Sequence, residues 1–262
     1  MQVRANGIGI NYELSGGEDA PVIMFSHSLG SNRLMWEPQM EAFRARYQVL
    51  RYDTRGHGNS EAPEGAYTLD QLGADAVGLL DALGIEKVHW VGLSMGGMIG
   101  QNVALNHPER LLSLALCDTA AAIPEEARPL FQERMDTARK AGMQALVQET
   151  LERWFTPPFV ARKSQEVERI RKCLLETPLA GFIGCTEAIK TLNYMERLSE
   201  IQMPTLIIVG EEDPGTPVAV ARAMHERIAG SILTVLPSAA HLSNIEQAEA
   251  FNRTLDAFLG DL

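Results

Sequence analysis

Three residues whose types could together cleave an ester stand far apart in the sequence: Ser94, Asp213 and His241. A serine hydroxyl is a poor nucleophile until a base takes its proton, and histidine is a suitable base at neutral pH. The imidazole needs an acid that fixes its tautomer and stabilises the imidazolium. Each residue follows a predicted strand, in the order serine, acid, histidine. This arrangement predicts a catalytic triad with Ser94 as nucleophile, Asp213 as acid and His241 as base.

The residues around Ser94 match a sharp strand-to-helix turn. An apolar run over residues 88–92 favours a strand, and small residues after Ser94 open a helical pattern. The segment Gly92-Leu93-Ser94-Met95-Gly96 fits Gly-x-Ser-x-Gly, in which side chains at the glycine positions would collide with neighbouring chain. Taken alone, the same five residues fit a tightly packed glycine-rich turn equally well.

Other residues compete for the roles of acid and base. Glu211 and Glu212 precede Asp213, but the turn at residues 213–215 gives the aspartate the defined backbone setting. His57 stands between two glycines, and we interpret it as a buried residue that organises its loop. We expect His27 to shape the loop after the strand at residues 22–25.

The negative charge that forms on a substrate carbonyl needs two donors. The N–H of Met95 follows the nucleophile and opens the helix, where free N–H groups and the helix dipole favour an anion. The second donor should come from the loop after the strand at residues 22–25, and we favour the N–H of Leu29. Ser28 in the same loop could add a polar contact.

The elements that must position these residues alternate between strand and helix. Apolar strands are predicted at residues 22–25, 47–52, 88–92, 111–117, 205–209 and 231–236, after two short strands within residues 2–14. After the strand at 205–209, Thr216 is predicted to cap a helix that has Pro217 at its first position. Near-continuous apolar strands separated by helices predict an α/β fold with a mostly parallel, doubly wound sheet. The carboxyl ends of such strands share one crevice, so the loops at His27, Asp53 and Ser94 should meet there.

The alternation stops between residues 121 and 195. Helices are predicted at 125–140, 143–155, 161–176 and 179–192, with no convincing strand between them. We therefore expect a helical cap over 121–195, inserted after the sixth strand into a core made of 1–120 and 196–262. This segment holds 11 Lys and Arg against 10 Asp and Glu. The balance fits either ordinary surface composition or a lid that tolerates an anionic substrate.

Composition narrows the classes of partner. A net charge of −11 argues against nucleic acid and anionic membranes. The three cysteines and an N-terminus without a signal-peptide pattern favour a cytoplasmic protein with reduced thiols. We expect no metal and no cofactor, because the sequence lacks metal-ligand spacing, a P-loop lysine and a dinucleotide fingerprint. The oligomeric state stays open, a homo-oligomer included.

These motifs resemble the α/β-hydrolase superfamily, which they match in order over the whole chain. The matching segments are His27-Ser28-Leu29-Gly30, residues 53–60, residues 92–97, residues 210–217 and residues 241–246. Many relatives have glycine where Ser28 stands. A serine at position 94 argues against haloalkane dehalogenases and epoxide hydrolases, which place aspartate there.

More closely, the chain resembles the 3-oxoadipate enol-lactonases of bacterial aromatic catabolism. The likeness lies in residues 27–30, residues 67–72 and the predicted lid segment 152–156. It implies hydrolysis of a small lactone that carries a free carboxylate, with no cofactor. We expect Arg153 and Trp154 to contact that carboxylate; otherwise Trp154 packs the lid and Arg153 is a solvated charge. The alternatives are a broader esterase, lactonase or perhydrolase, and a ligand-binding relative without catalysis.

Overall fold

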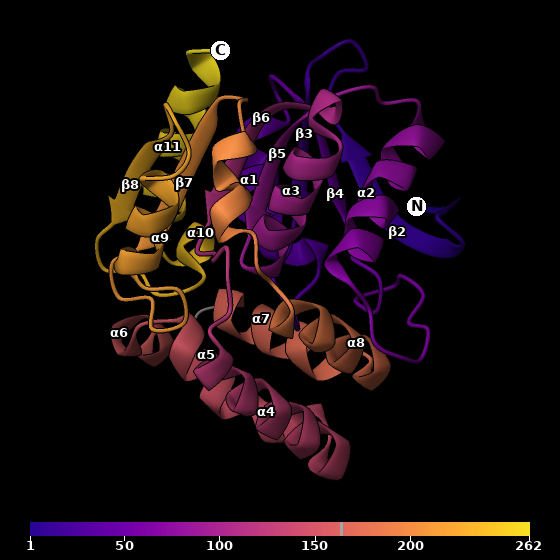
Figure 1. Cartoon of the computed structure of the whole chain (residues 1–262), viewed down its shortest axis with the longest axis vertical. Helices are drawn as coiled ribbons and strands as arrows, with labels where there is room; N and C mark the ends of the chain where they lie inside the picture. Colours follow the sequence, from indigo (N-terminus) through magenta and orange to yellow (C-terminus); the bar gives the residue numbers. More distant parts are fainter. Residues whose placement is uncertain (163–164) are drawn as a thin grey trace.

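The computed structural model describes residues 1–162 and 165–262 and is built around a sheet of eight strands (Figure 1). The strands lie in the order β1-β2-β4-β3-β5-β6-β7-β8. Strands β3 to β8 run parallel, and β1 and β2 pair antiparallel at one edge. The predicted mostly parallel sheet is thereby confirmed. The strand bounds are β1 Gln2–Ala5, β2 Ile8–Ser15, β3 Val22–Ser26, β4 Gln48–Tyr52, β5 Val88–Leu93, β6 Leu111–Cys117, β7 Thr205–Gly210 and β8 Ile232–Leu236.

Helices cover both faces of the sheet, as the alternating pattern predicts. One apolar core lies under α2 (Leu69–Leu83), α3 (Met95–Asn106) and α9 (Val218–His225). The other lies under α1 (Glu37–Phe43) and α11 (Ala248–Gly260). Successive strand residues alternate between the two cores, because side chains along a strand point to opposite faces. On β5, for example, Trp90 belongs to the first core and Val91 to the second.

Between β6 and β7 the chain leaves the sheet and forms helices. These are α4 (Arg128–Ala141), α5 (Val147–Trp154), α6 (Pro157–Ala161), α7 (Gln165–Glu176) and α8 (Leu179–Lys190). In Figure 1 they gather below the sheet, away from both termini. An isolated antiparallel bridge between Ala122 and Asn193 joins the two ends of this segment. The predicted helix 161–176 runs partly over residues 163–164, which lie outside the described residues.

We refer to residues 121–195 as the cap; its status as a separate domain stays a prediction. Two of its predicted helix boundaries are wrong. The predicted helix at 143–155 is a short 3₁₀ turn, Met143–Leu146, followed by α5, and an additional helix, α6, begins at Pro157. Proline at the first position of a helix lacks only an N–H that would have no intrahelical partner there. In the part of the chain that is described, no helix is both long and apolar enough to cross a bilayer.

Candidate active site

Ser94 stands alone between the end of β5 and the start of α3. Its φ of 54° and ψ of −115° lie in a region that side chains rarely adopt, as expected of a serine projected from a sharp turn. A Cβ on Gly92 would come within 2.2 Å of the Gly96 carbonyl oxygen, and a Cβ on Gly96 within 2.0 Å of the Ser26 carbonyl oxygen. Both glycines are therefore required for the close approach of strand, turn and helix.

Asp213 and His241, predicted from sequence as acid and base, are hydrogen-bonded to each other. The His241 Nδ1–H donates to Asp213 Oδ2 across 2.8 Å. The carboxylate also accepts from the N–H of Gly215 at 2.8 Å and from the N–H and hydroxyl of Thr216 at 3.1 and 2.5 Å. These contacts fix the imidazole ring so that Nε2 is the nitrogen left for a proton from a nucleophile.

The charge on Asp213 is stabilised by its neighbours. Burial would raise the pKa of this carboxyl, but the His241 ring and the Thr216 donors together hold the pKa below its ordinary value. Glu211 and Glu212 are both exposed, and neither pairs with the ring in the described residues. The structure therefore places the aspartate, and neither glutamate, beside the histidine.

Thr216 does not have the role predicted for it. The sequence suggests Thr216 as the N-cap of a helix that begins with Pro217, whereas α9 begins at Val218 and its N-cap residue is Pro217. The Thr216 hydroxyl donates to Asp213 instead of accepting from a helix N–H. The prediction is wrong because a nearby carboxylate is a stronger partner for a hydroxyl than a helix N–H.

The two histidines near the first loops organise backbone, as predicted. His57 Nε2 accepts from the N–H of Gly30 at 2.9 Å, and His27 Nε2 accepts from the N–H of Thr54 at 2.9 Å. Both rings are fully buried. Burial, together with the neighbouring His27, lowers the pKa of His57 to about 3, and burial lowers the pKa of His27. Neutral imidazoles that accept backbone hydrogen bonds are unavailable as catalytic bases.

In the loop after β3, the N–H groups on either side of Leu29 both have partners. The Ser28 N–H contacts the Met35 sulfur at 3.4 Å, the Gly30 N–H bonds to His57, and the Ser31 N–H donates to the Ser28 carbonyl at 3.2 Å. The Leu29 N–H has no hydrogen-bond partner in the described chain, nor has the Met95 N–H at the start of α3. These are the two groups predicted as oxyanion donors.

The hydroxyl of Ser28, predicted as a possible extra polar contact, is buried and directed elsewhere. It lies 3.8 Å from the Met35 sulfur, a weak acceptor, and Ser28 is 1% exposed. The contact joins the loop to the 3₁₀ turn Arg33–Trp36. Ser28 thus supports the loop from behind, and a direct contact with a substrate stays a prediction.

Trp154 joins the cap to two loops of the core. Its carbonyl accepts from the N–H of Leu242 at 3.0 Å, directly after His241. A Cβ on Gly30 would lie 3.8 Å from its ring and 2.7 Å from the Leu174 side chain. Trp154 is buried, and so it packs the cap against the core whatever its role toward a substrate.

Arg153 precedes Trp154 at the end of α5 and is half-buried. Its Nε atom is buried without a hydrogen-bond partner in the described residues. Burial lowers the pKa of its guanidinium, while the charges of Glu149 and Asp213 act in the opposite direction. The influence of Asp213 indicates that the guanidinium lies within electrostatic reach of the Asp213–His241 pair.

Two buried carboxyl groups near the site escaped the sequence reasoning. Glu246 accepts from the Thr156 N–H at 3.2 Å, from the Thr156 hydroxyl, and from the Ala240 N–H at 3.0 Å. Asp118, directly after β6, accepts from the Gly210 N–H at 2.7 Å and from the Ser243 hydroxyl at the start of α10 (Ser243–Glu246). The position of Asp118 at the carboxyl end of a strand could have indicated from the sequence that it lies near the site, whereas nothing in the sequence around Glu246 indicates this.

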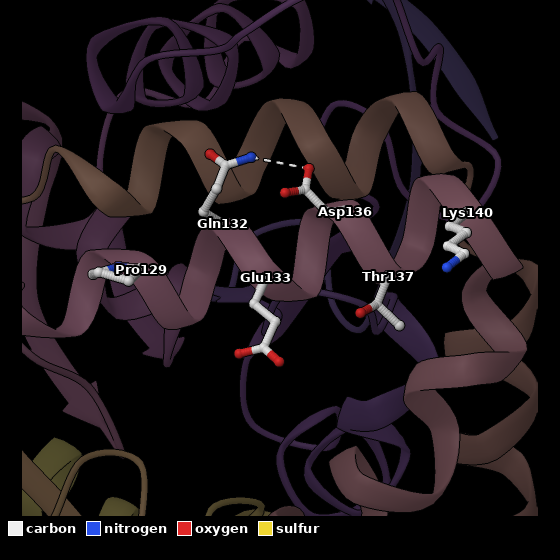
Figure 2. Close-up of a pocket in the computed structure, with 6 residues that line it drawn as sticks. All are labelled: Pro129, Gln132, Glu133, Asp136, Thr137 and Lys140. Carbon is white, nitrogen blue, oxygen red and sulfur yellow. Dashed lines mark hydrogen bonds between the residues drawn. The ribbon is translucent and has the colours of Figure 1, made fainter.

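A hollow on α4 lies apart from this chemistry (Figure 2). All the residues that line it come from this one helix: Pro129, Gln132, Glu133, Asp136, Thr137 and Lys140. Figure 2 shows the Gln132 amide donating to the Asp136 carboxylate, a bond of 3.0 Å. None of the candidate catalytic groups lines the hollow. Among the described residues, no cluster of His, Cys, Asp and Glu could hold a metal ion.

Comparison with known proteins identifies the family to which this chain belongs. A family model described as the alpha/beta hydrolase fold matches residues 21–248, which include Ser94, Asp213 and His241. The chain belongs to the α/β-hydrolase fold family. This α/β hydrolase is 39% identical over 255 residues to 3-oxoadipate enol-lactonase 2 of Acinetobacter baylyi, covering 97% of this chain and 94% of that relative.

Solved structures give the same result for this α/β hydrolase. An enol-lactonase from Burkholderia xenovorans LB400 matches with a TM-score of 0.96 and 39% identity, covering 99% of this chain and 100% of that one. A thermophilic esterase from Thermogutta terrifontis, solved with malate bound, matches with a TM-score of 0.93 and 28% identity, covering 100% of this chain and 98% of that one. The likeness therefore includes the cap as well as the core.

Proposed function

We propose that this protein hydrolyses 3-oxoadipate enol-lactone to 3-oxoadipate, a step of the β-ketoadipate pathway of aromatic catabolism. The observation that carries the proposal is the near full-length likeness to enol-lactonases, at 39% identity to the Acinetobacter relative and a TM-score of 0.96 to the Burkholderia structure. The Asp213–His241 pair and the turn at Ser94 supply the groups that a serine hydrolase needs.

The proposed reaction proceeds through an acyl-enzyme. His241 takes the proton of Ser94, whose oxygen attacks the lactone carbonyl carbon. The free N–H groups of Met95 and Leu29 donate to the oxyanion of the tetrahedral intermediate. The ring carbon–oxygen bond then breaks, and the leaving enol takes a proton from His241 and tautomerises to the ketone. His241 next activates water, which hydrolyses the ester on Ser94 and frees the second carboxylate.

The free carboxylate of the lactone is the feature that distinguishes it from a simple ester. Arg153 suits this group because its guanidinium is half-buried, with an unsatisfied Nε atom and within electrostatic reach of Asp213. Trp154 would form an apolar wall beside it, between the cap and the oxyanion loop. Hydrolysis of the enol-lactone by Arg153→Ala and Trp154→Ala tests these assignments, and unchanged kcat/KM in both would refute them.

A substrate panel tests the proposed function itself. We expect kcat/KM for the enol-lactone to exceed that for p-nitrophenyl acetate by orders of magnitude, and Ser94→Ala to abolish both activities. A fluorophosphonate should label the wild-type protein stoichiometrically and leave Ser94→Ala unlabelled. A clear preference for the simple ester would instead support a broader esterase, the class of the Thermogutta relative. A failure of labelling would support a ligand-binding protein.

The cellular setting belongs to the same proposal. A small carboxylated metabolite as substrate agrees with the net charge of −11, which disfavours nucleic acid and anionic lipid. The three cysteines are buried and free, as a reducing cytoplasm would keep them. We therefore propose a cytoplasmic enzyme.

A further inference from the structure

Three arginines of the cap, Arg134, Arg153 and Arg169, lie half-buried without an ion pair among the described residues, and the first two contact or belong to the same helix, α5. Arg134 belongs to α4 and Arg153 to α5, and neither forms an ion pair with any described residue. Buried arginines of the core behave differently: Arg55 pairs with Asp75 at 2.6 Å and Arg51 pairs with Glu37 at 2.6 Å. A buried charge normally has a partner, since its removal from water is costly. The unpaired arginines therefore require an explanation.

A contact between Arg134 and α5 brings Arg134 to the same face of α5 as Arg153. The Arg134 guanidinium donates to the Thr150 hydroxyl, a long hydrogen bond of 3.5 Å. Thr150 and Arg153 are three positions apart in α5, a spacing at which helix side chains are neighbours. Thr150 is 1% exposed, so the contact lies on the inner face of α5. The two guanidinium groups thus lie against the same part of the cap interior.

The positive charges of Arg134 and Arg153 repel each other. Burial, and then repulsion by Arg153, lower the pKa of Arg134 to about 10, while Glu149 acts in the opposite direction. Glu149 is the acidic residue that influences both arginines, yet it is exposed and forms no ion pair with either in the described chain. An anion between the arginines would relieve their repulsion and replace the hydration that each has lost.

Arg153 belongs to the end of α5 that contacts the loop of His241. Arg153 senses the charge of Asp213, and the carbonyl of the next residue, Trp154, is bonded to Leu242 beside His241. Arg134 contacts the preceding turn of α5 through Thr150.

We propose that Arg134 is a second substrate-binding residue, which forms with Arg153 a two-arginine site for the free carboxylate of the substrate. The inference rests on the proposed function for the identity of that substrate. Guanidinium groups recognise carboxylates through paired N–H donors, and two of them would select a carboxylated acyl compound over a neutral one. Position 134 of the sequence gave no sign of this role, because it reads as one of several charges on an amphipathic helix.

The test compares two esters that differ only at the far end of the acyl chain. Mono-p-nitrophenyl glutarate carries a free carboxylate at the end of its acyl chain, and p-nitrophenyl valerate carries a methyl group at the same carbon. We expect Arg134→Gln to lower kcat/KM for the glutarate ester by roughly 10- to 100-fold, the range for loss of a charged hydrogen bond. The loss should appear mainly in KM, and the valerate ester should be unaffected. Arg134→Lys should retain part of the preference.

The matched control is Arg139→Gln, since Arg139 is an exposed arginine of the same helix that pairs with Asp136 at 2.8 Å. It should leave both esters unchanged. Equal losses on the two esters by Arg134→Gln would assign Arg134 a structural role, and no loss on either would remove it from the site; both results overturn the inference.

Two further measurements keep the inference testable. If Arg134→Gln does not fold, the Lys variant and the salt dependence of the wild type decide, since added NaCl should weaken turnover of the glutarate ester alone. A wild type that ignores the enol-lactone but prefers the glutarate ester would refute the proposed function and support the arginine site. A wild type without preference between the esters would refute the site.

Discussion

Removing the carboxylate of Glu246 should loosen both the cap and the segment that carries His241. Glu246 is 8% exposed and belongs to α10 (Ser243–Glu246). It accepts hydrogen bonds from the N–H and hydroxyl of Thr156, in the cap, and from the N–H of Ala240, directly before His241. One buried carboxylate therefore holds two segments that are 90 and 6 positions away in the sequence.

The magnitude follows from the donors that are left behind. Glu246→Ala leaves three donors without an acceptor, and each buried donor without a partner costs about 1–3 kcal/mol. Water that enters the vacated volume recovers part of this, so we expect a total loss of about 3–5 kcal/mol in the free energy of unfolding, as for breaking a buried charged pair. Glu246→Gln keeps one carbonyl acceptor and should cost about 1–2 kcal/mol.

The assay combines stability and turnover. Denaturant unfolding of Glu246→Ala should show the loss, with Tm lowered by roughly 6–20 °C. At a temperature where the variant is folded, kcat should fall, because the backbone before His241 has lost its anchor. Glu249→Ala is the control: this residue is exposed on α11, and its replacement should change stability by less than about 0.5 kcal/mol.

A double-mutant cycle separates the two links. Thr156→Val removes the hydroxyl donor in the cap, and its cost should shrink by at least about 1 kcal/mol in the Glu246→Ala background. Additive costs would refute the direct Thr156–Glu246 interaction. A Glu246→Ala protein as stable and as active as the wild type would refute the reasoning altogether.

Three other perturbations have defined outcomes. The pKa of His57 is lowered to about 3 in the folded protein, so the unfolded chain binds more protons between about pH 6.5 and 3, and the folded state loses stability as the pH falls through that window. For His57→Gln, the free energy of unfolding should therefore fall less steeply with decreasing pH; an unchanged pH dependence contradicts the lowered pKa of His57. Gly96→Ala places a Cβ 2.0 Å from a backbone oxygen and should lower kcat/KM on p-nitrophenyl acetate by about 10²-fold or more, whereas wild-type activity would show that the turn can shift at no cost. Burial, and then the charge of Asp213, raise the pKa of Asp118 well above its ordinary value, so exchange of this carboxyl for an uncharged amide of similar shape should cost little. Asp118→Asn, which tolerates the φ of 43°, should unfold within about 1 kcal/mol of the wild type, and Asp118→Leu should be several times more destabilising; equal costs would contradict the raised pKa.

The sequence predicts the sheet and the pairing of Asp213 with His241 well because they depend on local patterns. Near-continuous apolar strands and their helical connections give the parallel sheet, and the rule that loops gather at carboxyl strand ends brings Asp213 and His241 together. Gly92 is predictable for a similar reason, since its close approach is to Gly96, only four positions away, whereas Gly96 approaches the distant Ser26 and is predicted only through the Gly-x-Ser-x-Gly pattern. Each of these predictions needs only the order of elements along the chain.

The helices of the cap show where such reasoning stops. Their apolar periodicity predicts that α4 and α5 exist, but not which side chains of one helix meet the other. Arg134 and Arg139 are equivalent by composition, yet Arg134 is half-buried against Thr150 and Arg139 is exposed beside Asp136. Helix periodicity fixes a face relative to its own axis, whereas burial of a charge depends on the helix packed against it.

The prediction for Thr216 fails for a related reason, and the failure explains why buried polar contacts are the least predictable part of the site. A threonine before a proline and a helix is a good local N-cap, but a carboxylate brought close by the tertiary fold takes its hydroxyl instead. Asp118 and Ser243 likewise bond across 125 positions of sequence. In each case the local sequence pattern also fits a residue at the surface. The tertiary packing determines the hydrogen-bond partner, because leaving a buried donor or acceptor unpaired costs more free energy than losing a helix cap. Asp213 is therefore the one partner of His241 that the sequence predicts, and the buried groups that support the pair, such as Thr216 and Glu246, are found only once the surrounding segments are in place.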